Sequence, residues 1–316
     1  MLLERISLDL GLDTDYLTGL ASAASHHYKK YEIPKKSGGS RLVFHPSKEL
    51  KAIQRWLSRN VISLFRVHPA AMAYRPRIGL RANAEIHAGN RYLLRMDLRD
   101  FFGSIRTDDV TRLFDDNQAL LPQGWTSTDT ELFCSFVMRN GRLTIGAVTS
   151  PAVSNVVFYE TDLKLASEAS SRQCKYTRYA DDLFFSSKAP NRLGLIQQEV
   201  ELLFSSKKTS LLHVEVNERK TRHQSTKTGR QVTGLVLTDN EGISLGRGKK
   251  RALRARIHRA TECTQAELES LRGYLAYVHS VEPGLLTRLI EKYGAKYIQA
   301  IQEGRRPIVV AGLRAV

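Results

Sequence analysis

Cysteine residues and long apolar runs are both scarce in this 316-residue chain. Its three cysteines, Cys134, Cys174 and Cys263, are far apart and odd in number, so they fit neither a zinc-binding pattern nor a disulfide framework. A reducing compartment is the expectation that follows. No apolar run approaches the roughly 20 residues of a membrane-spanning helix, and charged residues interrupt the apolar ones at the start of the chain. We therefore expect a soluble cytoplasmic protein with no membrane partner.

Acidic residues are too few to balance the basic ones. The chain has 48 Lys and Arg against 32 Asp and Glu, a formal net charge of +16. The excess is concentrated in residues 205–259, where fourteen basic residues accompany four acidic ones. A polyanion is the natural partner of such a chain, although basic charge alone also fits ribosome association or an anionic membrane surface.

A pair of adjacent carboxylates, Asp181 and Asp182, is the most informative feature of the sequence. The pair ends the run Tyr179–Asp182, which the flanking apolar residues place at the tip of a strand, turn and strand. Most Asp-Asp pairs are solvated turn residues, so a partner is needed. Upstream, the strand-like run Tyr92–Phe102 carries Asp97 where a buried strand prefers Val or Ile.

A buried Asp97 requires a compensating charge. A divalent cation held jointly by Asp97, Asp181 and Asp182 would supply it, because carboxylate oxygens and substrate phosphates are the ligands that Mg²⁺ prefers. The alternative is that Asp97 caps a turn or pairs with Arg95 or Arg99.

These residues, in this order and spacing, resemble the polymerase motifs of reverse transcriptases. Asp97 matches motif A, Leu143–Pro151 followed by Asn155 matches motif B, and Tyr179–Asp182 matches motif C. Motif B departs from the common pattern at Ile145, where many family members have Gln. This departure leaves the role of position 145 open and does not affect the metal chemistry.

Two further signatures resemble the bacterial retron type within that family. Asn83–His87 matches the Asn-Ala-x-x-His signature, and Val232–Gly234 matches the Val-Thr-Gly signature. The resemblance runs from about Arg41 to about His258. Because Asn83 and His87 are one helical turn apart, a purely structural contact between them is the alternative to a role in RNA binding.

The resemblance implies the α/β fold of right-hand polymerases, with fingers, a ferredoxin-like palm of α+β type and a helical thumb. The fingers are expected at residues 1–91 and 107–142. The palm is expected at 92–106 and 143–244, and an RNA-binding thumb at 245–316.

The resemblance also implies a two-metal mechanism. Asp97, Asp181 and Asp182 would hold two Mg²⁺ ions about 3.5–4 Å apart, which activate the primer hydroxyl and hold the triphosphate. Lys220 matches the motif D lysine, which could neutralise or protonate the pyrophosphate leaving group. The alternative is a solvated lysine on a basic loop.

Several residues are predicted to contact the incoming dNTP. Residues 35–41 predict a glycine-bearing basic hairpin tip suited to clamping phosphates, although such tips are often only solvated. In the family, Phe102 lies where a bulky ring excludes a ribose 2′-hydroxyl, while its neighbour Phe101 is expected in the core. The predicted dNTP-binding residues are Arg41, Asp100, Phe102, Gly146 and Asn155.

A structured RNA is the second predicted ligand. Leu253 and Ile257 form an apolar stripe on a helix whose remaining face is basic, and such a helix can follow a duplex backbone. Specificity for one RNA is expected to come from this helix together with the two retron signatures. The predicted RNA-binding residues are Asn83, His87, Val232, Thr233, Gly234, Lys249, Lys250 and Arg254.

As a retron-type enzyme, the chain is expected to reverse-transcribe a cognate noncoding RNA in the bacterial cytoplasm. Priming from a guanosine 2′-hydroxyl would give branched multicopy single-stranded DNA (msDNA), and an accessory effector protein would join it in anti-phage defence. No RNase H domain is expected in this length. Two alternatives stay open: another bacterial reverse transcriptase, of group II intron or defence type, or an RNA/DNA-binding scaffold that restrains a toxic effector.

Overall fold

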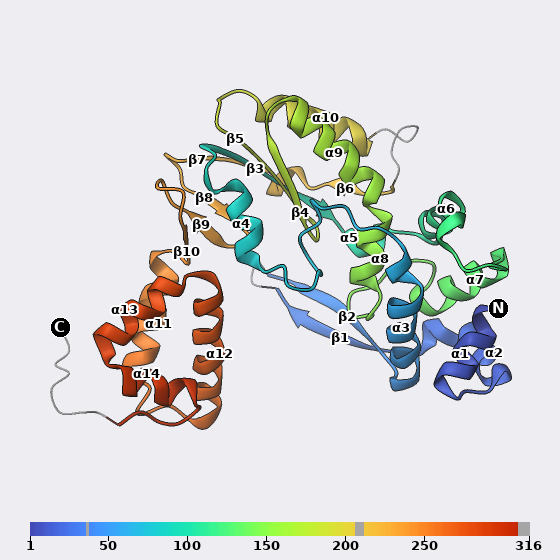
Figure 1. Cartoon of the computed structure of the whole chain (residues 1–316), viewed down its shortest axis with the longest axis horizontal. Coiled ribbons are helices and arrows are strands. Elements are labelled where there is room, and N and C mark those ends of the chain that lie inside the picture. Colours follow the sequence, from blue (N-terminus) through green and yellow to red (C-terminus); the bar gives the residue numbers. More distant parts are fainter. Residues whose placement is uncertain (36–37, 206–211, 309–316) are drawn as a thin grey trace. The chain divides into compact units, whose positions relative to one another are not determined.

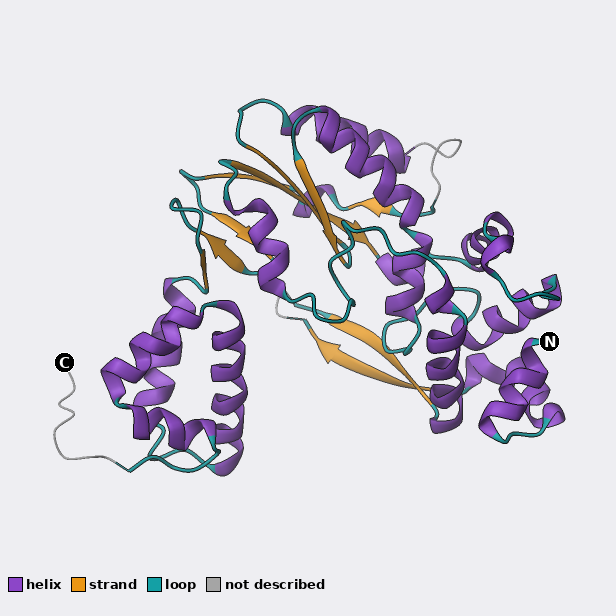
Figure 2. Cartoon of the chain, viewed as in Figure 1, coloured by secondary structure: helices purple, strands orange, loops and turns teal. Residues whose placement is uncertain are grey.

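The chain contains both helices and strands (Figures 1 and 2). The computed structural model describes residues 1–35, 38–205 and 212–308. The mixed α/β class predicted from the sequence is therefore confirmed. None of the helices in these ranges combines the length and apolar character that crossing a bilayer requires.

Two compact units make up the chain. Residues 1–76, 94–185 and 191–222 form the first unit, and residues 77–93, 186–190 and 223–316 form the second. These units do not coincide with the segments predicted from the sequence. Most of the predicted fingers and palm lies in the first unit, but residues 77–91 of the predicted fingers and 223–244 of the predicted palm lie in the second.

The first unit contains most of the helices before residue 206 and a two-stranded hairpin. Its helices are α1 (Leu2–Leu10), α2 (Thr14–Ala23), α3 (Lys48–Asn60), α5 (Phe101–Ser104), α6 (Thr107–Asp116), α7 (Ser127–Val137), α8 (Ser150–Val157), α9 (Tyr159–Ser171) and α10 (Leu193–Ser205). Strands β1 (Tyr28–Pro34) and β2 (Ser40–Pro46) form the hairpin in antiparallel register. The predicted basic hairpin is thus present, and residues 36 and 37 of its tip lie outside the described ranges.

A five-stranded sheet carries the predicted carboxylates. Its strands are β3 (Tyr92–Arg99), β4 (Lys175–Tyr179), β5 (Asp182–Ser187), β6 (Glu215–Val216) and β7 (Arg222–Ser225). The order is β4-β5-β3-β6, with β7 also paired to β3. Consecutive residues of β3 and β5 are fully buried, as in a strand covered on both faces. The strands predicted around Asp97 and Asp181 are therefore confirmed and lie side by side.

The second unit combines a small sheet with a group of helices. Its elements are α4 (Leu80–Ala88), β8 (Arg230–Val232), β9 (Leu235–Leu237), β10 (Ile243–Ser244), α11 (Arg247–His258), α12 (Gln265–Val281), α13 (Pro283–Tyr293) and α14 (Ala295–Gln302). Strands β8 and β9 are joined by a two-residue turn in which Thr233 and Gly234 both have positive φ, 48° and 78°. Positive φ at both central residues is the pattern of a type I′ hairpin turn.

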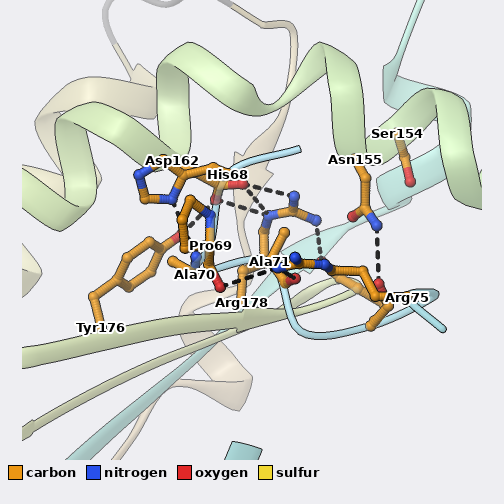
Figure 3. Close-up of polar contacts among 12 residues, drawn as sticks. His68, Pro69, Ala70, Ala71, Arg75, Ser154, Asn155, Asp162, Tyr176 and Arg178 are labelled. Atoms are coloured by element: carbon orange, nitrogen blue, oxygen red, sulfur yellow. Dashed lines mark hydrogen bonds and ion pairs between the residues drawn. The ribbon is translucent and has the colours of Figure 1, made fainter. Parts of the chain in front are cut away.

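A buried ion pair joins β4 to α9 (Figure 3). The guanidinium of Arg178 donates to both carboxylate oxygens of Asp162 at 2.9 and 2.7 Å, and both side chains are fully buried. The Tyr176 hydroxyl donates to the same carboxylate at 2.8 Å. The guanidinium also lies over the ring of Phe158, 4.6 Å from its centroid. These contacts fix the strand that leads into the Asp181–Asp182 turn.

Replacing Asp162→Asn should lower the free energy of unfolding by about 3–5 kcal/mol, because it leaves the buried Arg178 charge uncompensated. Urea unfolding of the variant measures the loss. The double variant Asp162→Leu/Arg178→Met is the matched control and should lose less, since no charge stays buried. A loss for Asp162→Asn no greater than that of the double variant would contradict this account.

Candidate active site

Asp97 and Asp181 come together in one cavity of the first unit, of about 1000 Å³. Asp97 projects from β3 and is 4% exposed, while Asp181 lies in the two-residue turn between β4 and β5. The amide of Leu98 donates to the Asp181 carbonyl at 2.8 Å, which ties the turn to β3. Ala180 in the same turn has φ of 56°, a left-handed value that is unusual for a residue with a side chain.

Asp97 has two hydrogen-bond donors as partners. The Lys220 ammonium donates to both carboxylate oxygens at 2.9 Å, and Asn217 Nδ2 donates to one of them at 3.0 Å. The amide of Asn217 also donates to the Asp97 carbonyl at 2.7 Å. The alternative pairing of Asp97 with Arg95 or Arg99 is therefore not what the structure shows. The sequence gave no signal for Asn217, which is 120 residues away in the chain.

Asp182 is engaged by a different cation. Arg95 Nε and Nη2 each donate to one Asp182 oxygen at 3.0 Å, a bidentate pair between neighbouring strands. Burial raises the pKa of Asp182 to about 6, against the opposing effect of Arg95. A supporting metal-ligand role for Asp182 stays a prediction, and it would require this pair to open.

The donor set of the cavity fits a hard cation. Burial raises the pKa of the Asp181 carboxyl, and the negative charge of Asp97 raises it further. A divalent cation between the two carboxylates would relieve that repulsion, as the Lys220 ammonium already does for Asp97. Within the described residues no group of three Asp, Glu, His or Cys side chains is arranged to hold a metal. An ion here would therefore take further ligands from a substrate, as Mg²⁺ does with phosphates.

Basic side chains dominate the rest of the cavity. The basic lining residues are Lys35, Arg41, Arg99, Arg139, Arg142 and Lys220, against Asp97, Asp100 and Asp181. The Arg139 guanidinium lies 3.9 Å from the centroid of the Phe44 ring, and Arg142 donates to the Gly103 carbonyl at 3.0 Å. Neither arginine is among the site residues predicted from the sequence. A polyanion such as a triphosphate suits this lining.

Three predicted dNTP-binding residues, Arg41, Asp100 and Phe102, line the cavity. Both Phe101 and Phe102 line the cavity, but Phe101 is 5% exposed and packs against Phe158 with ring centroids 5.1 Å apart, so Phe102 is the more exposed of the two. A Cβ at Gly103 would lie 2.3 Å from an Asp100 carboxylate oxygen. Glycine at position 103 therefore leaves room for the Asp100 side chain.

Gly146 and Asn155 are not among the residues that line the cavity, and a dNTP contact for either stays a prediction. Gly146 has φ of 106°, and a Cβ there would lie 2.5 Å from the carbonyl oxygen of Phe44 in β2. The amide of Phe44 donates to the Ile145 carbonyl at 2.7 Å, so glycine permits β2 to cross this loop. Asn155 is 2% exposed and donates to the Ala73 carbonyl at 2.9 Å.

The retron signatures lie in the second unit and are largely internal. Asn83, His87 and Val232 are fully buried, so their side chains are not open to RNA in this structure. His87 Nδ1 lies 2.7 Å from Ser186 Oγ, and Asn90 Nδ2 donates to the same hydroxyl at 2.7 Å. Burial of Asn83 and His87 fits a structural role, and direct RNA contact for either stays a prediction.

The three basic residues predicted on α11 differ in their hydrogen bonds and in their exposure. Lys249 Nζ donates to the Gly234 carbonyl at 2.7 Å, which supports the turn after Thr233. Lys250 pairs with Glu282 at 2.7 Å and is one-fifth exposed. Arg254 is exposed and available to a ligand.

Burial of His87 predicts a pH-dependent stability. Burial lowers the pKa of its imidazole to about 3, from 6.5. Below pH 6.5 the unfolded chain binds a proton that the folded chain does not, so stability falls as pH falls. Between pH 7 and pH 5 this group should remove about 2 kcal/mol from the free energy of unfolding.

Denaturant unfolding across this pH range, with His87→Asn alongside, measures the effect. The variant should lose this part of the pH dependence. The matched control His258→Asn, at an exposed position of α11, should keep it. Equal pH slopes for His87→Asn and the unmodified protein would contradict the account.

Comparison with known proteins identifies the family. Residues 33–237 match the family model described as reverse transcriptase (RNA-dependent DNA polymerase). The retron Ec83 reverse transcriptase of Escherichia coli is 32% identical over 308 residues, covering 92% of this chain and 94% of that protein. The retron Ec86 reverse transcriptase of the same species is 29% identical over 310 residues, covering 97% and 92%.

Among solved structures, apo telomerase from Candida tropicalis aligns with a TM-score of 0.47 at 10% identity, covering 88% of this chain and 61% of that one. From the family model and the curated relatives, the chain belongs to the reverse transcriptases and is an RNA-directed DNA polymerase of the retron type.

Proposed function

We propose that this reverse transcriptase copies a cognate structured noncoding RNA, primed from the 2′-hydroxyl of a guanosine in that RNA, into branched msDNA. The observation that carries the chemistry is the pairing of Asp97 with Asp181 in one basic cavity. The similarity to retron reverse transcriptases supports an RNA template. The 2′-hydroxyl primer, a bacterial cytoplasmic setting, an accessory effector protein and a role in anti-phage defence are further parts of the proposal.

Reverse transcriptases use divalent metal ions. Asp97 and Asp181 are proposed to hold two Mg²⁺ ions here, with Asp182 as a supporting ligand. When bound, such ions lower the pKa of the attacking hydroxyl and neutralise the triphosphate. Lys220 must release Asp97 for an ion to bind there. Its ammonium is then free within the same cavity to neutralise or protonate the leaving pyrophosphate, which is the motif D role.

The remaining lining residues position the nucleotide. The guanidinium groups of Arg41, Arg139 and Arg142 suit the triphosphate, because arginine binds phosphate oxygens in a planar, two-point manner. Phe102 is proposed to pack against the sugar and exclude a ribose 2′-hydroxyl. In the second unit, exposed Arg254 is proposed to bind the RNA backbone, and the Thr233–Gly234 turn supported by Lys249 to shape the adjacent RNA surface.

Replacing Asp97→Asn or Asp181→Asn should reduce dNTP incorporation by about a thousandfold or more, because each change removes a carboxylate proposed to hold the Mg²⁺ ions that neutralise the transition state. Incorporation of labelled dNTP with Mg²⁺ measures the loss. Asp108→Asn, at an exposed carboxylate of α6 outside the cavity, is the matched control and should keep activity within about twofold. Equal activities for the two cavity variants and the control would refute the assignment.

The product tests the retron reaction itself. The protein copurified with its native RNA should incorporate labelled dNTP without an added primer, and a debranching enzyme should shift the product because its DNA starts from a 2′-linked guanosine. The matched control is the same reaction with Asp181→Asn/Asp182→Asn, which should give no product. DNA without a branch would indicate another type of bacterial reverse transcriptase. RNA binding without DNA synthesis would indicate a scaffold that restrains an effector.

A further inference from the structure

Residues 68–75 of the first unit are held against the sheet by contacts from two elements (Figure 3). The Arg178 amide donates to the Ala70 carbonyl and the Met72 amide donates to the Arg178 carbonyl, both at 2.8 Å. These bonds form a short parallel bridge between Ala71 and β4. Because the buried Arg178–Asp162 pair fixes Arg178, the segment has a rigid support.

A second anchor comes from α8. Asn155 Nδ2 donates to the Ala73 carbonyl at 2.9 Å, and the Asn155 side chain points toward this segment in Figure 3. Arg75 Nη1 folds back on the same segment, 3.3 Å from the Ala71 carbonyl. The backbone is therefore held at residues 70–73, immediately before residue 74.

The residue presented by these anchors is Tyr74. Its φ is 62°, a left-handed value that a bulky side chain rarely adopts and that costs on the order of 1–3 kcal/mol. Its side chain is not used to fill the core, since Tyr74 is 49% exposed. Strain of this kind persists where the surrounding contacts impose it, as the bonds from Asn155 and Arg178 do here.

The Tyr74 ring lines the same cavity as Phe102 and Asp181. The rings of Tyr74 and Phe102 are tilted by 40° with centroids 6.3 Å apart, within the range of interacting aromatic pairs. Burial and the nearby charge of Asp181 raise the pKa of the Tyr74 phenol, so it stays neutral at physiological pH. Phe102 is in the four-residue helix α5 and is part-exposed, so a neighbouring ring limits the positions it can adopt.

We propose that Tyr74 is a specificity-determining residue that forms, together with Phe102, the wall that excludes a ribose 2′-hydroxyl from the nucleotide site. Asn155 is the positioning residue, acting through the Ala73 carbonyl. This inference rests on the proposed role of Phe102. Exclusion of a single hydroxyl requires a wall that cannot move aside, and the anchored backbone of residue 74 provides that rigidity.

Single-nucleotide incorporation on an RNA template, with kcat/KM measured for each rNTP and dNTP, tests the proposal. Tyr74→Gly removes the ring and also relieves the strained φ, so it should fold at least as well as the unmodified protein. It should raise the rNTP-to-dNTP ratio of kcat/KM about tenfold. The matched control Tyr74→Phe keeps the ring and should keep the ratio within about twofold.

Asn155→Asp is isosteric but cannot donate to the Ala73 carbonyl, so it should shift the ratio in the same direction as Tyr74→Gly. The two changes together should not add, because they act on the same wall. A loss of kcat without a change in the ratio would show that Asn155 has a structural role only, and would overturn its part of the proposal.

Phe102→Ala separates this inference from the one on which it rests. If Phe102→Ala raises the ratio and Tyr74→Gly leaves it unchanged, Phe102 excludes the hydroxyl alone and the role of Tyr74 is wrong. If Phe102→Ala leaves the ratio unchanged, the proposed role of Phe102 fails. A raised ratio for both variants, with Tyr74→Phe unchanged, supports the two-ring wall.

Discussion

Compensation of buried negative charge is the constraint on which the site depends. The first unit brings Asp97, Asp181 and Asp182 onto neighbouring parts of one sheet, where desolvation and repulsion oppose the ionisation of Asp181 and Asp182. The chain supplies a separate cation for two of them, Lys220 for Asp97 and Arg95 for Asp182. The charges of Lys220 and Arg41 also act on Asp181, and a divalent cation in the cavity would compensate its carboxylate further.

Local patterns were sufficient to predict the elements that carry the carboxylates. Alternating and continuous apolar runs gave the strands around Asp97 and Asp181, and a basic glycine-bearing segment gave the β1–β2 hairpin, because these signals depend on near neighbours in the chain. The partners of the carboxylates could not be predicted in the same way. Lys220 is 123 residues from Asp97, and Arg95 is 87 residues from Asp182. Only the folded sheet brings them together.

The retron signatures show a second reason why the site could be predicted only in part from the sequence. Polar residues such as Asn83 and His87 suggest contact with a ligand, yet both are fully buried. Arg230 links the two signature regions from inside, since it donates to the Ala88 carbonyl at 3.2 Å and to the Thr238 carbonyl at 2.9 Å. Asn83, His87 and Val232 of the signatures therefore lie in the interior of the second unit. Any effect of these three residues on RNA binding would act through the packing of that unit.

The contact between Lys220 and Asp97 also changes what a metal titration of this protein measures. Both carboxylate oxygens of Asp97 accept hydrogen bonds from the Lys220 ammonium. An ion that binds Asp97 therefore competes with that ammonium. Binding is then an exchange equilibrium, and the apparent affinity is the intrinsic affinity reduced by the population of the closed ion pair. A substrate that attracts the Lys220 ammonium would shift that population, so metal and nucleotide would bind with positive thermodynamic coupling.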